Sequence, residues 1–276
     1  ASNTDELHNR TRDFCIRRLK SEVLTELPAK VRSLHYINPT SQQSKDYNAL
    51  LRKWLDEYDA HRHYGTLPKG FVLNMLTDLR KKCGEIKIAS AVEWVMNYLA
   101  HNDKPLVMFT HHLDIMDGIV SQLQYVKDYV EISGKPIVVF AHHRDILQSI
   151  FTTLREDENL RGKVGAIAGD MPAQKRQQQV EAFQRGDLMV LVCSTIAAKE
   201  GITLTASDTT LFVEREWVPA YEEQAEDRVN RIGQESQSVS AVYLSVENTI
   251  DEKFNYVIEQ KRKVVQAVLV GGTVEE

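Results

Sequence analysis

From Pro105 onward the chain alternates short, continuous apolar runs with amphipathic stretches. Apolar runs that are separated by helical segments are typical of parallel strands covered on both faces. The pattern therefore predicts an α/β fold with a doubly wound, mostly parallel sheet. The runs lie at 106–110, 137–141, 164–168, 189–193, 210–213 and 239–244.

Helical periodicity dominates the chain before Pro105 and again at its end. Thr40 and Gln43 form a capping-box pattern that opens a helix with apolar residues at 3.6-residue spacing from Tyr47 to Tyr58. The other expected elements are a strand or extended connection at 31–37, a loop at 61–70, helices at about 71–82 and 86–100, a helix from 172 to about 185 that Gly186 ends, and a long helix at 250–269.

One stretch of the sequence occurs twice. Lys104–Ile115 recurs as Lys135–Ile146, and the helical stretches before the two copies also match weakly. A fixed offset over a strand and its flanking helices indicates a duplicated β-α unit, with copies at 104–123 and 135–154. The additional unit either widens the sheet or covers one of its edges.

Composition changes this picture little. The 276 residues can form one large or two small domains, and 42% apolar with 26% charged residues is ordinary for a globular protein. A net charge of −5 argues against a surface that coats nucleic acid generally, although a local basic groove stays open. The three cysteines are scattered, and no segment resembles a membrane span or a secretion signal. We therefore expect a soluble, intracellular protein without a zinc site or disulfide framework.

The segment from Gln224 to Gln234 carries the strongest candidate chemistry. If it is helical, Gln224, Arg228 and Arg231 share one face, Ile232 can face inward, and Gly233 lets the helix stop. Two guanidinium groups on one face repel each other, but their planar forks match the oxygens of a polyphosphate. The segment is therefore a candidate site for polyphosphate.

A solvated helix face is the alternative for this segment, and composition alone favours it. In that case Glu222, Glu226 and Asp227 are the partners of the arginines. A resemblance argues against it: Gln-Ala-x-x-Arg-x-x-Arg-Ile-Gly-Gln is similar to the last signature motif of the Swi/Snf family of DNA-translocating ATPases, in helicase superfamily two. The resemblance implies a RecA-like lobe, ATP hydrolysis and binding of double-stranded DNA.

In that family the two arginines reach across a cleft and stabilise charge on the transferred phosphoryl group. By position, Arg231 corresponds to the arginine finger, a type of residue that contributes roughly 10³–10⁵ in rate. Arg228 is its companion, and Gln224 supports both. The family usually has histidine where this chain has Asn230. Trp217 lies in a stretch that resembles the family's Trp-Asn-Pro turn, and it is either a core aromatic or a ligand.

Ser194 and Thr195 follow an apolar run and resemble the start of the family's fifth motif. The resemblance implies that both residues contact a DNA phosphate and that Gly201 approaches the nucleotide. Taken alone, a Ser-Thr pair after a strand is equally a helix cap. The chain departs from the family pattern at Lys199, Glu200 and Thr203.

Further DNA contacts are implied at two other places. Phe-Ala-His-His resembles the fork-remodelling, DNA-annealing branch of the family, so His142, His143 and Arg144 are expected to border DNA, with the second copy of the duplicated unit as the working one. Lys175 and Arg176 lie near a predicted helix N-terminus, which favours phosphate. A plain charged surface helix is the alternative for these two. The adjacent histidines lack supporting ligands, so no metal site is expected.

Two features of a complete motor are absent from the sequence. It contains no phosphate loop of the form Gly-x-x-x-x-Gly-Lys-Ser/Thr, and no apolar run ends in Asp-Glu for magnesium. Both belong to the first lobe of such a motor, so the isolated chain is expected to be inactive, with ATP and Mg²⁺ bound only when the first lobe holds the magnesium. The resemblance divides the chain into the end of the first lobe (1–28), a helical linker (29–103), the second RecA-like lobe (104–246) and a closing helix with tail (247–276).

The implied partners are double-stranded DNA, the first lobe of the same polypeptide and DNA-bound proteins, without a membrane. The implied location is the nucleus in a eukaryote, or the cytoplasm or nucleoid in a bacterium or virus. Two rival functions stay open. One is a degenerate lobe that docks DNA or protein without catalysis, which Lys199 and Glu200 favour; the other is a strand-separating helicase of the same superfamily.

Overall fold

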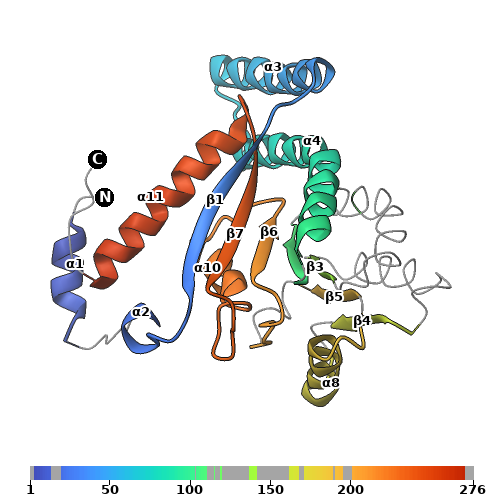
Figure 1. The fold of residues 1–276 in the computed structure, drawn as a ribbon. Coiled ribbons are helices and arrows are strands. Elements are labelled where there is room, and N and C mark those ends of the chain that lie inside the picture. The colour runs from blue at the N-terminus through green and yellow to red at the C-terminus, as the bar shows by residue number, and fades with distance from the viewer. Residues whose placement is uncertain are drawn as a thin grey trace.

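The computed structural model describes residues 3–13, 20–102, 104–110, 115, 119, 137–141, 162–167, 171–188, 190–194 and 201–270. These residues contain a seven-stranded sheet in which all neighbouring strands are parallel (Figure 1). The strand order is β1-β7-β6-β2-β3-β5-β4. The strands are β1 Ala29–Ile37, β2 Leu106–Phe109, β3 Ile137–Ala141, β4 Val164–Ile167, β5 Val190–Ser194, β6 Thr209–Phe212 and β7 Ser238–Val246.

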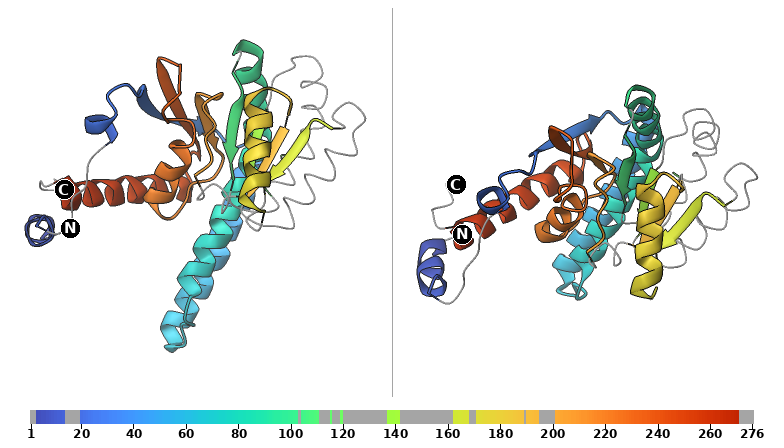
Figure 2. Two further views of the ribbon diagram at one scale, coloured as in Figure 1. Left: turned by 90° about the horizontal axis from the view of Figure 1, so that it is seen from below. Right: turned by 60° about the horizontal axis from the view of Figure 1, so that its bottom comes forward.

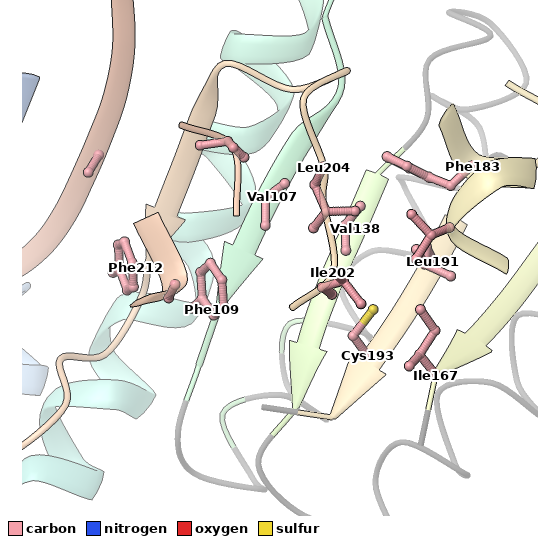
Figure 3. Packing of buried hydrophobic residues seen from close by; sticks show 14 of the residues in the cluster. Val107, Phe109, Val138, Ile167, Phe183, Leu191, Cys193, Ile202, Leu204 and Phe212 are labelled. Atoms are coloured by element: carbon pink, nitrogen blue, oxygen red, sulfur yellow. The ribbon is translucent and has the colours of Figure 1, made fainter. Parts of the chain in front are cut away.

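All the apolar runs predicted as strands are strands of this sheet, which confirms the predicted α/β fold with a mostly parallel sheet. Successive residues of a strand point to opposite faces, and two cores result. On one face Leu106 and Met108 pack in a cluster with residues of α4 (Phe71–His101). On the other face Val107 and Phe109 pack in a cluster with residues of α8 (Ala173–Gln184), as Figure 3 shows.

The other helices are α1 Thr4–Thr11, α2 Lys20–Val23, α3 Ser41–Tyr64, α10 Pro219–Glu226 and α11 Ile250–Val270. α3 and α4 lie side by side as a hairpin that projects from the sheet (Figure 2). The predicted capping box of α3 is confirmed, because Gln43 N–H donates to Thr40 Oγ1 at 3.2 Å and Thr40 N–H donates to Gln43 Oε1 at 2.8 Å. The bounds of α8 and α11 also agree with the prediction.

Two expectations about the hairpin are wrong. The loop expected at 61–70 is shorter, because α3 continues to Tyr64 and ends at Gly65, where φ is +64°. The two helices expected at 71–82 and 86–100 are one helix of 31 residues. Gly84 lies between the two expected helices, and α4 passes through it at a close contact. A Cβ there would lie 2.6 Å from Ile115 Cγ1.

The duplicated unit forms two neighbouring strands in the middle of the sheet. β2 pairs with β3 in parallel, and Leu106 is opposite Ile137 just as Phe109 is opposite Phe140. Each residue of β2 is therefore opposite its own counterpart in β3. β2 inserts between β6 and β3. Of the two possibilities left open by the sequence, the additional strand widens the sheet rather than covering its edge.

β1 contains residues 31–37, which were expected to be a strand or an extended connection. It pairs with β7 along all nine of its residues and forms one edge of the sheet. Ahead of it, α1 packs against α11, and His8 Nδ1 lies 2.9 Å from Val268 O. Among the helices that the structure describes, no candidate for a membrane span is found.

Candidate functional site

The segment that carries Arg228 and Arg231 is not a continuous helix. α10 ends at Glu226, and both arginines lie in the turns that follow it. The expectation that Gln224, Arg228 and Arg231 share one helix face is therefore wrong. Ile232, which was expected to face inward, is 68% exposed.

A contact with another element fixes the end of α10. Glu226 is fully buried, and Arg32 of β1 donates to both of its carboxylate oxygens at 2.7 Å. After Glu226 the chain turns tightly, with Arg228 N–H donating to Ala225 O at 3.1 Å. Gly233, expected to end the helix, instead takes a φ of +95° beyond the two arginines, a backbone conformation that glycine adopts readily.

Arg231 reaches back to residues 201–203, in the segment that precedes β6. Its Nη1 donates to Gly201 O at 2.6 Å, to Thr203 Oγ1 at 3.1 Å and to Ile202 O at 3.3 Å. Gly201 has a φ of +82°, which orients this carbonyl group. The structure thus brings together Gly201 and Arg231, two residues that the sequence assigned to a nucleotide.

Arg228 is a buried cation next to a second one. Its side chain is 5% exposed, and among the described residues no acceptor is within hydrogen-bonding distance of its Nε. The pKa of Arg228 is lowered to about 10, mainly by burial and further by the charge of Arg231, with Asp227 opposing both. The backbone is well fixed, because Leu204 N–H donates to Arg228 O at 2.8 Å. A buried guanidinium whose Nε lacks a partner is costly, and an arriving anion would offset that cost.

Two further residues of the motif, Gln224 and Asn230, lie close to Arg228 in the sequence. Gln224 lies on the exposed side of α10, before the turn. Asn230 is 6% exposed, and its Oδ1 has no hydrogen-bond partner within the described part of the chain. Within the described part of the chain, this turn therefore holds two of the buried polar atoms that lack partners, Arg228 Nε and Asn230 Oδ1.

Among the described residues, the ion pairs of the acidic side chains in this segment are with cations other than Arg228 and Arg231. Glu222 and Glu226 are fully buried rather than solvated, so the alternative of a solvated helix face is wrong. Glu222 accepts from Arg215 at 2.9 and 2.7 Å and from Arg262 at 2.6 Å. The acidic side chains therefore tie α10 to the sheet and to α11, and they leave Arg228 and Arg231 to other partners.

The residues predicted to contact DNA follow strands that end at one edge of the sheet. Ser194 is the last residue of β5 and is opposite Ala141, the last residue of β3. Lys175 is exposed near the start of α8, and Arg176 Nη2 donates to Met171 O at 2.9 Å. Carboxyl ends of parallel strands are where open α/β sheets bind ligands. The predicted residues His142, His143, Arg144 and Thr195 lie outside the described residues.

Two further residues have structural roles. Gln234, the last residue of the arginine motif, donates from Nε2 to Ser207 O at 2.7 Å and to Val229 O at 3.0 Å. It joins the arginine turn to the chain just before β6, a role that sequence reasoning missed, although its presence in the motif was a signal. Trp217 packs edge-on against Phe254 with ring centroids 4.5 Å apart, which favours the core-aromatic alternative.

Two protein-family descriptions match the chain. Residues 121–233 match the helicase conserved C-terminal domain, and residues 1–88 match the SNF2-related domain. The Mus musculus protein named DNA annealing helicase and endonuclease ZRANB3 is 31% identical over 272 residues, which is 98% of this chain and 22% of that protein. The chain thus spans about a fifth of the length of the curated relatives it matches.

Solved structures are similar to the fold. The chain resembles the C-terminal part of the Fun30 ATPase domain, with a TM-score of 0.51, 17% identity, and coverage of 84% of this chain and 90% of that one. It also resembles the Sulfolobus solfataricus SWI2/SNF2 ATPase core in complex with double-stranded DNA, with a TM-score of 0.51, 20% identity, and coverage of 97% and 52%. At these identities the likeness establishes a shared fold.

Proposed function

We propose that this chain, which belongs to the Snf2 family of helicase superfamily two, supplies the second motor lobe of an ATPase that moves along double-stranded DNA. ATP would bind between this lobe and a first lobe of the same polypeptide. The arginines of this lobe would complete the site when the two lobes close. Residues 1–28 would end the first lobe, 29–103 link the two, 104–246 form the second lobe and 247–276 close it.

The observation that carries the proposal is the state of Arg228. Its guanidinium is buried, its Nε has no partner within the described residues, and the charge of Arg231 lowers its pKa further. Two adjacent, mutually repelling cations weaken a fold on their own. They suit a site at which negative charge arrives, because a phosphate pairs with both and removes the repulsion.

The residues present fit a triphosphate. Arg228 and Arg231 would hold its phosphate groups, with Gly201 and Gln224 beside them, whereas magnesium would be held by the first lobe. When bound, ATP supplies a phosphoryl group whose developing charge the arginines stabilise, an effect worth roughly 10³–10⁵ in rate. Arg231 is already fixed by Gly201, Ile202 and Thr203, so little of its side chain would need ordering.

DNA would bind along the edge of the sheet where β3 and β5 end. His142, His143, Arg144, Ser194, Thr195, Lys175 and Arg176 would contact its phosphates. Contacts of this kind carry no base information, so movement would be largely independent of sequence and binding would weaken with salt. Proteins bound to the DNA are a further proposed class of partner, and an intracellular location is part of the same proposal.

ATP turnover by the two-lobed parent polypeptide, with and without duplex DNA, tests this function. We expect strong stimulation by duplex DNA, displacement of a third strand from a triplex, and no separation of the duplex itself. Duplex separation would favour the strand-separating rival. Turnover that is indifferent to DNA, or no turnover by a folded parent, would contradict the proposal and leave a docking lobe.

A further inference from the structure

The two acids that immediately precede Arg228 are bound by the N-terminal segment of the chain. Lys30 of β1 lies 2.9 Å from Glu226 Oε2 and 2.8 Å from Asp227 Oδ1. Arg32, on the same face of β1, forms the two-pronged contact with Glu226 described above. Lys20 of α2 adds a third cation, 2.6 Å from Asp227 Oδ2.

The contact of Lys20, Lys30 and Arg32 with Glu226 and Asp227, called the joint below, differs from an ion pair on the surface because its central carboxylate is buried. Glu226 is fully buried, Lys30 is 19% exposed and Arg32 is 37% exposed. Tyr243 of β7 donates to Glu226 Oε1 at 2.5 Å, so the carboxylate has a donor from each of two adjacent strands. Burial alone would raise the pKa of Glu226, but Arg32, Lys30 and Tyr243 together hold it at about 2. Glu226 is therefore ionised at neutral pH and stays bound to Arg32, Lys30 and Tyr243.

The joint lies where the arginine turn begins. Glu226 is the last residue of α10, and Arg228 N–H donates to Ala225 O within the same turn. On its other side the turn is held by Leu204 N–H donating to Arg228 O, and by Arg231 donating to Gly201 O. The backbone between Glu226 and Arg231 is thus fixed at both ends, and the residues of β1 fix the end at Glu226.

The joint also connects the two matched family regions. Lys20, Lys30 and Arg32 lie within residues 1–88, which match the SNF2-related domain. Glu226, Asp227 and both arginines lie within 121–233, which match the helicase C-terminal domain. A displacement of β1 would therefore act directly on the position of the arginine turn.

We propose that Lys30 and Arg32 are positioning residues that hold Arg228 and Arg231 in place and link them to the segment leading in from the first lobe. The inference rests on the proposed function, in which these arginines act on ATP. A misplacement of about 1 Å at a catalytic group can cost on the order of a hundredfold in rate. Loss of Arg32 should therefore lower turnover without weakening the binding of ATP or DNA.

The test uses the two-lobed parent polypeptide and the variants Arg32→Gln, Arg32→Lys and Lys30→Gln. Arg52→Gln is the matched control, because Arg52 lies exposed on α3. For Arg32→Gln we expect DNA-stimulated kcat to fall about ten- to a hundredfold, with KM for ATP changed less than about twofold. Arg32→Lys should recover part of kcat, because it keeps the charge but not the fork. Binding of a fluorescent duplex should equal that of the control.

A merely structural role would lower the melting temperature and leave kcat per folded molecule unchanged, which would overturn the inference. If Arg32→Gln does not fold, Lys30→Gln and Arg32→Lys provide the test. An unchanged kcat in both variants would overturn the inference, whereas a reduced kcat at constant KM would support it. Arg231→Ala in the same preparation separates the two proposals. If it abolishes turnover while the β1 variants are normal, only this inference fails; if it has no effect, the proposed function fails as well.

Discussion

Arg231 Nη1 lies 2.6 Å from the carbonyl oxygen of Gly201, a residue thirty positions earlier in the chain. This hydrogen bond joins the arginine turn to the segment before β6, so residues of the two motifs that resemble a motor's nucleotide site lie together. It depends on the backbone of Gly201, whose φ of +82° suits glycine and few other residues. The position of Arg231 is therefore set in part by a glycine.

Gly201→Ala tests that dependence. Among the described residues no atom lies within 4 Å of a Cβ built at this position, so the substitution strains the backbone, at a cost of about 1 kcal/mol. Relief of the strain should move the carbonyl that accepts from Arg231. We expect DNA-stimulated kcat of the two-lobed parent to fall several-fold, measured by phosphate release.

Gly65→Ala is the control for this change. Gly65 has a φ of +64° and is also free of contacts within 4 Å, but it ends α3, outside the arginine site. Both variants should lose similar stability in urea, and only Gly201→Ala should lose turnover. Equal turnover in the two variants would show that the Gly201 carbonyl does not position Arg231.

The free energy of unfolding should fall at acid pH as Glu226 takes up a proton. Its pKa of about 2 in the folded chain lies below the ordinary value of 4.5, so the unfolded chain takes up a proton first as pH falls. The stabilisation is complete above about pH 5 and is lost progressively toward pH 2, with a total of about 3 kcal/mol. Urea unfolding at several pH values between 7 and 3 should show this slope.

Glu226→Gln should remove that part of the pH dependence and should lower stability at pH 7, because Arg32 and Lys30 lose their buried partner. Asp59→Asn, on the exposed side of α3, is the control and should change neither quantity. A slope that is the same in Glu226→Gln and in the unchanged protein would contradict the account of this carboxylate.

Gly84→Ala should destabilise the protein, although the same change in an exposed helix stabilises by about 1 kcal/mol. The added Cβ would lie 2.6 Å from Ile115 Cγ1 and 2.8 Å from its Cδ1. Overpacking of this kind costs about 1–3 kcal/mol. Because Ile115→Ala opens that space, the double variant should lose less stability than the sum of the two single variants in chemical denaturation. Additive losses would show that the two residues do not press on each other.

Lys175→Gln should reduce the salt dependence of DNA binding. Each phosphate contact of a lysine contributes about 0.9 to the slope of log affinity against log salt concentration. We expect the slope for the two-lobed parent on duplex DNA to fall by about that amount, by fluorescence anisotropy. Lys53→Gln, exposed on α3, should leave the slope unchanged. An unchanged slope for Lys175→Gln would remove this residue from the DNA interface.

β2 and β6 could be predicted because they are buried at every residue and leave continuous apolar runs, whereas β1, which is mostly exposed, was predicted only as a strand or an extended connection. The end of α10 could not, because the residue that fixes it is distant: Arg32 binds Glu226 across 194 positions. The continuity of α4 through Gly84 likewise depends on Ile115, which no local pattern indicates. At the candidate site, the resemblance indicated Gly201, Arg228 and Arg231. The hydrogen bond between Arg231 and Gly201 and the hydrogen bonds of Gln234 are tertiary contacts, and no spacing in the sequence specifies them.

The most direct test of the central claim is DNA-stimulated ATP turnover by the two-lobed parent carrying Arg231→Ala, compared with Arg52→Ala and with the unchanged protein. The account predicts that turnover in the presence of duplex DNA falls by about 10³-fold or more, while the variant stays folded and still binds DNA. Turnover that persists within a few-fold of the control would contradict it, because Arg231 would then take no part in ATP hydrolysis.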